Sequence, residues 1–287
     1  MKKRITTFFL AIILIISGTA YAKQDKYEVH FLDVGQSDCI LIKASNKNYI
    51  IDTGAEYYCD RILQYLEANS VDKIDTIILT HYHDDHYGGL LRLVQRKKVK
   101  NVLIPKHYNE EKVDLYKGLA KIQVKVKTIS EGWKFKKGKI NLEAIAPFKE
   151  DNIIENNNSV VIQGDIDGIK YLFAADCEKN EEEDMLQRVV IKKCDVLKVP
   201  HHSLDTSSTE DFINVVEPKI AIVTCDGIGT PDNKIIERIY NKGALILRSD
   251  LHGNIVIKNN FIRCDKNGIN IRINQSPLSV RNEGLCP

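Results

Sequence analysis

The chain carries one dense cluster of residue types that bind metal ions in proteins. Residues 81–86 read His-Tyr-His-Asp-Asp-His, so three of the eight histidines and two aspartates fall within six positions. Imidazole and carboxylate groups are the ligands that zinc, iron and manganese take. Side chains two residues apart share a face of extended chain, so His81 and His83 can converge on one ion. Asp85 and His86 begin the next segment, where the turn directs their side chains towards a position beside the first ion.

A short apolar run precedes this cluster. Residues 76–79 are Thr-Ile-Ile-Leu, a β-branched and aliphatic stretch typical of a strand buried on both faces. The alternative is a solvated loop that is rich in histidine, and the density of ligand types argues against it. A buried strand that ends in metal ligands predicts a metal centre at the edge of a sheet.

Two further ligand groups end apolar strands in the second half of the chain. Asp176 follows the strand Gly168–Phe173 and two alanines, whose small side chains leave room for an ion. Later, an apolar strand runs into His201, His202 and Ser203. The residues do not decide which imidazole binds, because one can be a ligand while the other contacts substrate.

The pattern His-x-His-x-Asp-His after a hydrophobic strand resembles the metal motif of the metallo-β-lactamase superfamily. The resemblance implies a four-layer αββα sandwich with the site at one edge, and two divalent metal ions, Zn²⁺ or Mn²⁺. It also implies how the ligands divide. His81 and His83 resemble ligands of one ion, and Asp85 and His86 ligands of the other, with Asp176 in the place of the bridging aspartate.

A second motif resembles that of one particular group within this superfamily. Residues 33–38 read Asp-Val-Gly-Gln-Ser-Asp. They are similar to the start of the extracellular nuclease-like domain of ComEC competence proteins, where the pattern is Asp-Val-Gly-Gln-Gly-Asp and Ser37 replaces the second glycine. The paired histidines before Ser203 also resemble that group's His-His-Gly-Ser pattern. Thr230-Pro231 departs from the family's His-Pro, which puts one substrate-side group in doubt.

The sequence allows two interpretations for each of three other candidate site residues. Asp52 ends a strand before Gly54, where it either caps a turn or, as in the family, supports the metal loop by hydrogen bonds. Asn158 lies in a segment that resembles the Asn-Asn-x-Ser of ComEC-like chains, so it faces either the metals and substrate or only its own turn. His252 lies on the turn Arg248–Gly253 and either reaches the cleft or stays exposed.

The chain has no histidine between His107 and His201, where many relatives in the family place a further ligand. The absence implies a more open, oxygen-rich coordination on one ion. Oxygen ligands suit manganese better than zinc, so the sequence favours manganese as the bound metal.

The N-terminus has the pattern of a secretory signal peptide. Lys2, Lys3 and Arg4 precede the apolar run Phe8–Ile16 and a small-x-small site that ends at Ala22. We therefore expect a signal peptide over 1–22, a single hydrolase domain over 23–265, a C-terminal tail over 266–287, and a secreted, extracytoplasmic protein. An uncleaved membrane anchor is the alternative, although the run is short for a membrane span.

Charge and cysteine content limit the partners. The formal net charge of +2 includes the three basic residues of the signal segment, so the remainder is close to neutral, unlike a dedicated nucleic-acid binder. Residues 92–139 are rich in lysine, either as solvated outer faces or as a local strip for a polyanion. The seven cysteines show no paired spacing, and we expect few disulfides or none.

These residues predict metal-dependent hydrolysis, because the chain has no serine nucleophile elbow and no nucleotide-binding loop. Asp85 is the expected catalytic residue, orienting a water molecule and moving its proton. The expected substrate is a phosphodiester, in nucleic acid or in a phosphorylated envelope polymer, and no obligate protein partner is evident. The first alternative is hydrolysis of a β-lactam, lactone or thioester. The second is a metal-bound module that binds DNA or polymer without turnover.

Overall fold

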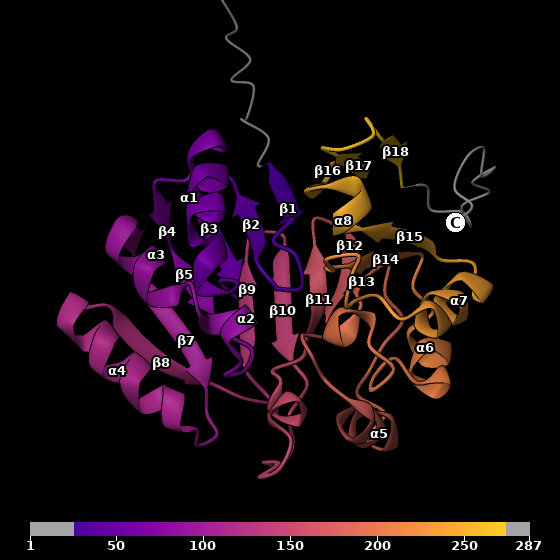
Figure 1. The fold of residues 1–287 in the computed structure, drawn as a ribbon, viewed down its shortest axis with the longest axis horizontal. Helices are drawn as coiled ribbons and strands as arrows, with labels where there is room; N and C mark the ends of the chain where they lie inside the picture. The colour runs from indigo at the N-terminus through magenta and orange to yellow at the C-terminus, as the bar shows by residue number, and fades with distance from the viewer. Residues whose placement is uncertain (1–25, 274–287) are drawn as a thin grey trace, which may run out of the picture.

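Runs rich in isoleucine and valine form the strands of two sheets in the computed structural model, which describes residues 26–273 (Figure 1). The first sheet has nine strands within the described residues. In spatial order they are β18 (Asn270–Arg272), β17 (Phe261–Cys264), β16 (Ile255–Lys258), β1 (Tyr27–Phe31), β2 (Ile40–Ala44), β3 (Lys47–Ile51), β5 (Thr76–Ile78), β7 (Asn101–Pro105) and β8 (Lys125–Ile129).

The second sheet has seven strands within the same residues. They are β15 (Leu245–Arg248), β14 (Ile220–Val223), β13 (Val196–Lys198), β12 (Ile169–Phe173), β11 (Ile162–Ile166), β10 (Ile140–Ala144) and β9 (Lys134–Lys137). A small parallel pair, β4 (Lys73–Ile74) and β6 (Lys98–Val99), stands apart from both sheets.

Helices cover the outer face of each sheet. Figure 1 shows α1, α3 and α4 along one side of the molecule and α5, α6 and α7 along the other. The described helices are α1 (Cys59–Ala68), α2 (Asp84–Tyr87), α3 (Leu90–Arg96), α4 (Glu110–Ile122), α5 (Lys179–Gln187), α6 (Glu210–Val216), α7 (Asn233–Asn241) and α8 (Ser249–His252), with 3₁₀ turns η1 (Glu56–Tyr58), η2 (Glu155–Asn158) and η3 (Pro200–Ser203).

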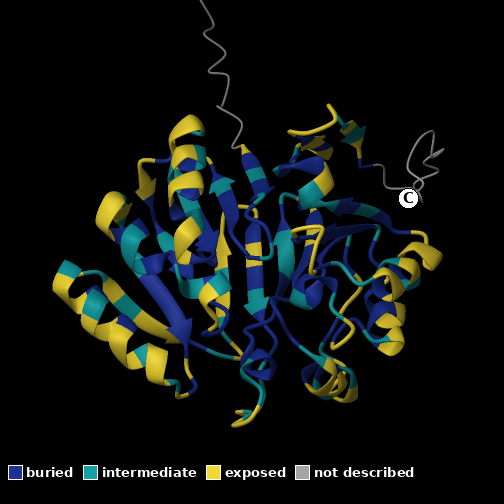
Figure 2. Ribbon diagram, in the orientation of Figure 1, coloured by how far each residue is buried: buried dark blue, intermediate teal, exposed yellow. Residues whose placement is uncertain are grey.

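Three apolar clusters hold these layers together. The inner cluster lies between the sheets, where Phe31 of β1 faces Phe173 of β12 with ring centroids 6.3 Å apart. Outer clusters join each sheet to its helices, and Figure 2 shows the buried strands against the exposed outer sides of the helices. A helix layer, two sheets and a second helix layer confirm the predicted αββα sandwich.

Strand direction brings the predicted ligand segments to one edge. β3 pairs parallel with β5, and β12 pairs parallel with β13. The carboxyl ends of parallel neighbours meet at the same edge of a sheet, which is where ligands bind in open α/β sheets. Asp52 follows β3 and the histidine cluster follows β5, while Asp176 follows β12 and the paired histidines follow β13.

The first sheet extends past the predicted domain boundary at residue 265. Residues 270–272 form β18, in which Ile271 lies opposite Ile262 of β17. Ile269 and Ile271 pack against the inner core, although the polar residues around them resemble a loose tail in sequence. The start of the expected tail therefore belongs to the sheet.

Other expectations fall partly beyond the described chain. Residues 274–287 and the predicted signal peptide over 1–22 lie outside the described residues. Within residues 26–273, no helix is long and apolar enough to cross a membrane. The cysteines of this part of the chain are free and buried, as the lack of paired spacing predicts.

The ionisation of Glu28 is expected to make the stability of the first sheet depend on pH. Glu28 of β1 accepts a hydrogen bond from His30 Nε2 at 3.0 Å and pairs with Lys258 Nζ of β16 at 2.6 Å. The hydrogen bond from His30, supported by Lys258, lowers the pKa of Glu28 from 4.5 to about 2. A carboxyl whose pKa falls on folding stabilises the native state above its unfolded pKa and loses that effect as pH falls through the folded pKa.

We therefore expect the wild-type chain to exceed Glu28→Gln in melting temperature at pH 7. This advantage should shrink between pH 4.5 and pH 2, the window set by the two pKa values of Glu28. Melting temperatures followed by circular dichroism across that range test it. The exposed Glu131→Gln is the control, and an advantage that does not change with pH would contradict the assignment.

Candidate metal centre

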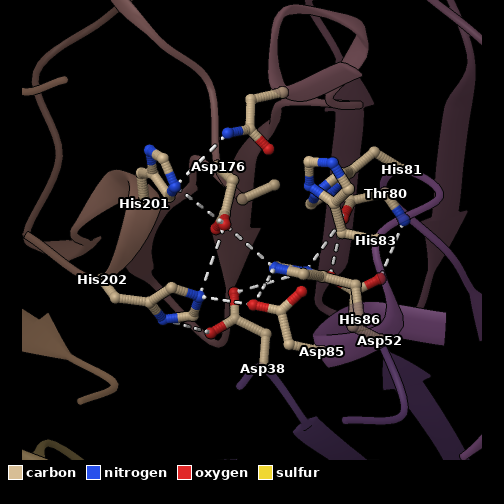
Figure 3. A network of polar contacts seen from close by, with 12 residues as sticks. Asp38, Asp52, Thr80, His81, His83, Asp85, His86, Asp176, His201 and His202 are labelled. Carbon is tan, nitrogen blue, oxygen red and sulfur yellow. Dashed lines mark hydrogen bonds and ion pairs between the residues drawn. The ribbon is translucent and has the colours of Figure 1, made fainter. Parts of the chain in front are cut away.

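Asp176 lies at the centre of a ring of imidazoles (Figure 3). Its Oδ2 atom is 3.2 Å from His86 Nε2, 3.4 Å from His202 Nε2 and 4.0 Å from His201 Nε2. The first imidazole comes from the first half of the chain and the other two come from the second. One carboxylate oxygen therefore faces ligands from both halves, as a bridging ligand must.

Four side chains form a compact donor group around this oxygen. One donor atom each from Asp85, His86, Asp176 and His202 lies within 4.8 Å of all the others. Asp85 Oδ2 is 3.3 Å from His202 Nε2 and 3.9 Å from His86 Nε2. Three of the four side chains are buried, and Asp85 is partly exposed, so a water molecule can reach it.

The side chains of His81 and His83 lie next to each other, as the two-residue spacing after a strand predicts. His81 Nε2 and His83 Nδ1 are 3.1 Å apart. Figure 3 shows both on the side of Asp176 opposite His201 and His202. The predicted division of ligands into two groups around Asp176 is thus compatible with the geometry.

The structure places the paired histidines differently from each other. His202 is fully buried, and its Nδ1 lies 2.8 Å from the carbonyl of Thr224, which directs Nε2 into the donor group. His201 is less buried, with Nδ1 2.7 Å from Thr206 Oγ1. His202 is therefore the better-placed ligand of the four-residue group, and His201 faces the same carboxylate from its outer side.

Backbone strain marks the same segment. His201, His202 and Ser203 have φ angles of 46°, 51° and 69°, in the left-handed region that non-glycine residues avoid. Such residues persist only where the surroundings hold them, and they cluster at functional sites. Here the His201 N–H donates to the carbonyl of Ala175, and the carbonyl of Ser203 accepts from the Asp232 N–H.

Asp52 supports the histidine cluster from beneath. Its Oδ1 accepts the Thr80 N–H at 2.8 Å, and its Oδ2 accepts the Thr80 hydroxyl at 2.7 Å and lies 2.8 Å from His86 Nδ1. Fixing Nδ1 in this way directs Nε2 of His86 towards Asp176. The hydrogen bonds make Asp52 a supporting residue of this segment and not only the cap of a turn.

A buried lysine completes the wall of the centre. Lys198 of β13 is 1% exposed, and its Nζ lies 2.6 Å from Asp38 Oδ2 and 3.4 Å from Asp176 Oδ1. It also donates to the carbonyl of Ala175 at 3.0 Å. With Oδ1 held by Lys198, Asp176 is left to face the imidazoles through Oδ2.

The charges of the centre shift its titrating groups. Burial opposes a charge on His86, but Asp176 and Asp52 outweigh it and hold the pKa of His86 well above its usual value. Burial likewise opposes a charge on His202, while Asp176 raises the pKa of His202 to about 9. For His81, burial and His86 together hold the pKa well below its usual value.

Three other predicted site residues make no hydrogen bond to the donor group within the described residues. Asn158 accepts the Asp151 N–H at 2.8 Å and donates to the Asp151 carbonyl at 2.9 Å, so its amide holds its own loop. His252 is buried, and its Nδ1 contacts the backbone of Arg248 at 2.9–3.0 Å. Ser203 is buried, and its hydroxyl has no hydrogen-bond partner within the described residues.

Sequence reasoning missed Asp38, Lys198 and Asn156. Asn156, two residues before the predicted asparagine, donates to Glu178 at 2.9 Å and lies 3.3 Å from His201 Nε2. In the sequence, Lys198 could be noticed only as the charged residue of the otherwise apolar segment 196–199. Asp38 could be noticed only as the last residue of the motif at 33–38. Neither feature shows that Lys198 and Asp38 form an ion pair.

The donor set fits divalent cations. The buried Nε2 atoms of His86 and His202 form no hydrogen bond within the described residues, although both face Asp176. Four carboxylates lie within this network: Asp38 and Asp176 contact the buried Lys198, Asp52 contacts His86, and Asp85 contacts His202. Unpaired donors and excess negative charge are what bound cations would balance.

Residues 32–227 match the family described as the metallo-beta-lactamase superfamily, and the chain belongs to this family. Members of the superfamily are in general metal-dependent hydrolases. The metallo-beta-lactamase fold protein YhfI from Bacillus subtilis shares the fold, with a TM-score of 0.57 over 82% of this chain and 100% of that chain, at 11% identity.

Within the family, the relatives that the chain matches include ComEC-like competence proteins. The chain is 27% identical over 251 residues to ComE operon protein 3 of Bacillus subtilis (strain 168), covering 79% of this chain and 32% of that protein. It is 24% identical over 253 residues to Competence protein ComA of Neisseria gonorrhoeae, covering 85% and 34%. The chain therefore spans about a third of the length of these relatives.

Removing the buried lysine should destabilise the fold more than removing its whole ion pair. Lys198→Met leaves Asp38 buried without its cation, and we expect the free energy of unfolding to fall by about 3–5 kcal/mol. The double variant Lys198→Met/Asp38→Asn should recover most of that loss. Urea denaturation of the metal-free proteins measures both, and equal losses in the two variants would refute the pairing.

Proposed function

We propose that this chain is an exported hydrolase that uses two divalent cations to cleave phosphodiesters. The observation that carries the proposal is the Asp176 oxygen, which faces histidines from both halves of the chain. Two bound cations supply Lewis acidity, activate a water molecule and neutralise charge that develops on phosphoryl oxygens. Relatedness to ComEC-like proteins and the signal-peptide pattern support the substrate class and the export.

Two of the proposed ligands, His86 and His202, are oriented by the protein's own hydrogen bonds. His81, His83, Asp85, His86, Asp176 and His202 would hold the cations, and His201 would serve as a further ligand or contact substrate. The hydrogen bonds of Asp52 and Thr224 fix the ring orientations of His86 and His202. Preorganised ligands spare the reaction the cost of ordering them.

Asp85 is the proposed proton acceptor. Its Oδ2 faces His202 and His86, and its side chain is 30% exposed, against 0–2% for the buried members of the donor group. Burial alone would raise its pKa, but contacts with His202 and His86 lower the pKa of Asp85, so it is ionised at neutral pH. An ionised, water-accessible carboxylate can orient a water molecule and take its proton.

An acidic cavity restricts how substrate approaches. A cavity of about 490 Å³ beside His83 is lined by Glu110, Glu111, Glu150 and Asp151 among others. A polyanion is repelled by such a wall, so a nucleic acid must approach the centre from another side. The basic residues of 92–139 are spread over α3, β6, α4, β8 and β9, which supports solvated outer faces over a continuous binding strip.

Hydrolysis of bis(p-nitrophenyl) phosphate tests the function. The protein is stripped of metal, reloaded with Mn²⁺ or Zn²⁺, and compared with Asp85→Asn. We expect metal-dependent turnover, with manganese favoured, that falls about 10²–10⁴-fold in the variant, the usual range for loss of an acid–base group. The matched control is Asp84→Asn, which alters the adjacent carboxylate on α2 outside the donor group.

Other outcomes point to the alternatives. Turnover of β-lactams, lactones or thioesters without cleavage of any phosphodiester would move the assignment to acyl substrates. Binding of DNA or envelope polymer that survives His83→Ala and Asp85→Asn, without turnover of either class, would favour a binding module. If the phosphodiester is cleaved, DNA and a phosphorylated envelope polymer are then compared as substrates.

A further inference from the structure

A second acidic cavity lies outside the donor group, against the start of α5. It measures about 420 Å³, and its walls come from residues 147–157 and from α5. Oxygen-bearing side chains dominate the lining, namely those of Asp151, Asn157, Glu181, Glu183 and Asp184. An acidic lining alone does not define a site, so the state of each buried group decides what the cavity can bind.

Glu181 is a buried carboxylate without a partner. It is 3% exposed, and neither Oε atom accepts a hydrogen bond within the described residues. Its neighbour Glu182 is equally buried but accepts the N–H groups of Ser208 at 2.5 Å and Thr209 at 2.8 Å. A buried carboxylate without hydrogen bonds is costly unless a cation or a proton neutralises it.

Asn157 supplies a second unsatisfied oxygen on the same cavity. It is 5% exposed, and its Oδ1 has no hydrogen-bond partner within the described residues. The orientation of the amide is set by its other end, because Nδ2 donates to Asp151 Oδ2 at 2.8 Å. Two side chains that line the cavity therefore carry three buried oxygen atoms without a hydrogen-bond partner within the described residues.

We propose that this cavity is a calcium site with Glu181 and Asn157 as ligands. Carboxylate and amide oxygens are the ligands that Ca²⁺ prefers, and the site has no imidazole or thiol that would favour a transition metal. Glu183 and Asp184 add negative charge to the wall, and Lys149, which also lines the cavity, is 69% exposed and pairs with Asp184 at 2.8 Å. The hydrogen bonds to Asp151 hold the loop that carries Asn157.

A cation here would join two elements beside the metal centre. Glu181 belongs to α5 and Asn157 to η2, and these two elements pack against each other. Asn156, the residue before Asn157, lies 3.3 Å from His201 Nε2. Calcium binding would therefore stiffen the segment that contacts the outer histidine, without any change in the ligands around Asp176.

A proton is the competing way to neutralise Glu181. Burial raises the pKa of Glu181 well above its usual value, and Glu182 and Asp184 add to the effect. The isosteric Glu181→Gln variant separates the two cases, because glutamine replaces a protonated carboxyl well but lacks the negative charge of a carboxylate ligand.

The experiment uses the full chain with two equivalents of Zn²⁺, so that the histidine centre is already filled. Ca²⁺ is added during calorimetric titration and thermal unfolding. We expect one Ca²⁺ per chain with a Kd on the order of 10⁻⁴–10⁻³ M, as in extracellular modules. The melting temperature should rise by roughly 3–5 °C at a tenfold excess of Ca²⁺ over Kd.

Variants decide the assignment. Glu181→Gln should weaken calcium binding at least tenfold, while Glu183→Gln, an exposed residue on the same wall, should change it about twofold or less. Glu181→Asp keeps the negative charge but withdraws the carboxylate by one methylene group and should also weaken binding, which keeps the test decisive if Glu181→Gln does not fold. Absence of any calcium response, or an unchanged response in Glu181→Gln, would overturn the proposal.

Discussion

A buried ion pair between Lys198 and Asp38 joins the two sheets beside the metal centre. Asp38 lies between β1 and β2 of the first sheet, and Lys198 lies on β13 of the second. The lysine is fully enclosed, so its charge must be balanced by carboxylates that stay in place. Because the same ammonium group also contacts Asp176 Oδ1, the position of the Asp176 carboxylate depends on how the sheets meet.

The rest of the centre follows from that junction. The first half brings His81, His83, Asp85 and His86 to the edge, and the second half brings Asp176, His201 and His202. Strand ends place these side chains, Asp52 and Thr224 orient two of the rings, and the strained turn at His201–Ser203 lets adjacent imidazoles face one carboxylate. A divalent cation fits this arrangement because the protein has already gathered the donors and the negative charge.

The resemblance carried by the His-x-His-x-Asp-His motif implied the αββα fold, and the donor residues could be proposed because each group follows an apolar strand. Sequence alone could not predict Lys198, since one lysine in an apolar run resembles a surface residue until the opposite sheet is known. The same limit explains the asparagines: a run of three is visible in sequence, but only the turn of η2 decides that Asn156 contacts His201 and Asn158 holds Asp151. Sequence also did not predict that the first sheet continues to β18. Ile269 and Ile271 pack against the inner core there, although the residues around them are polar.

The most direct test of a two-cation centre bridged by Asp176 is anomalous X-ray diffraction from crystals of the Mn²⁺-loaded protein. The account predicts two anomalous peaks, one bounded by Asp85, His86 and His202 and the other by His81 and His83, with Asp176 between them. The Asp176→Asn variant should lose at least one peak. A single peak, or two peaks away from Asp176, would contradict the account.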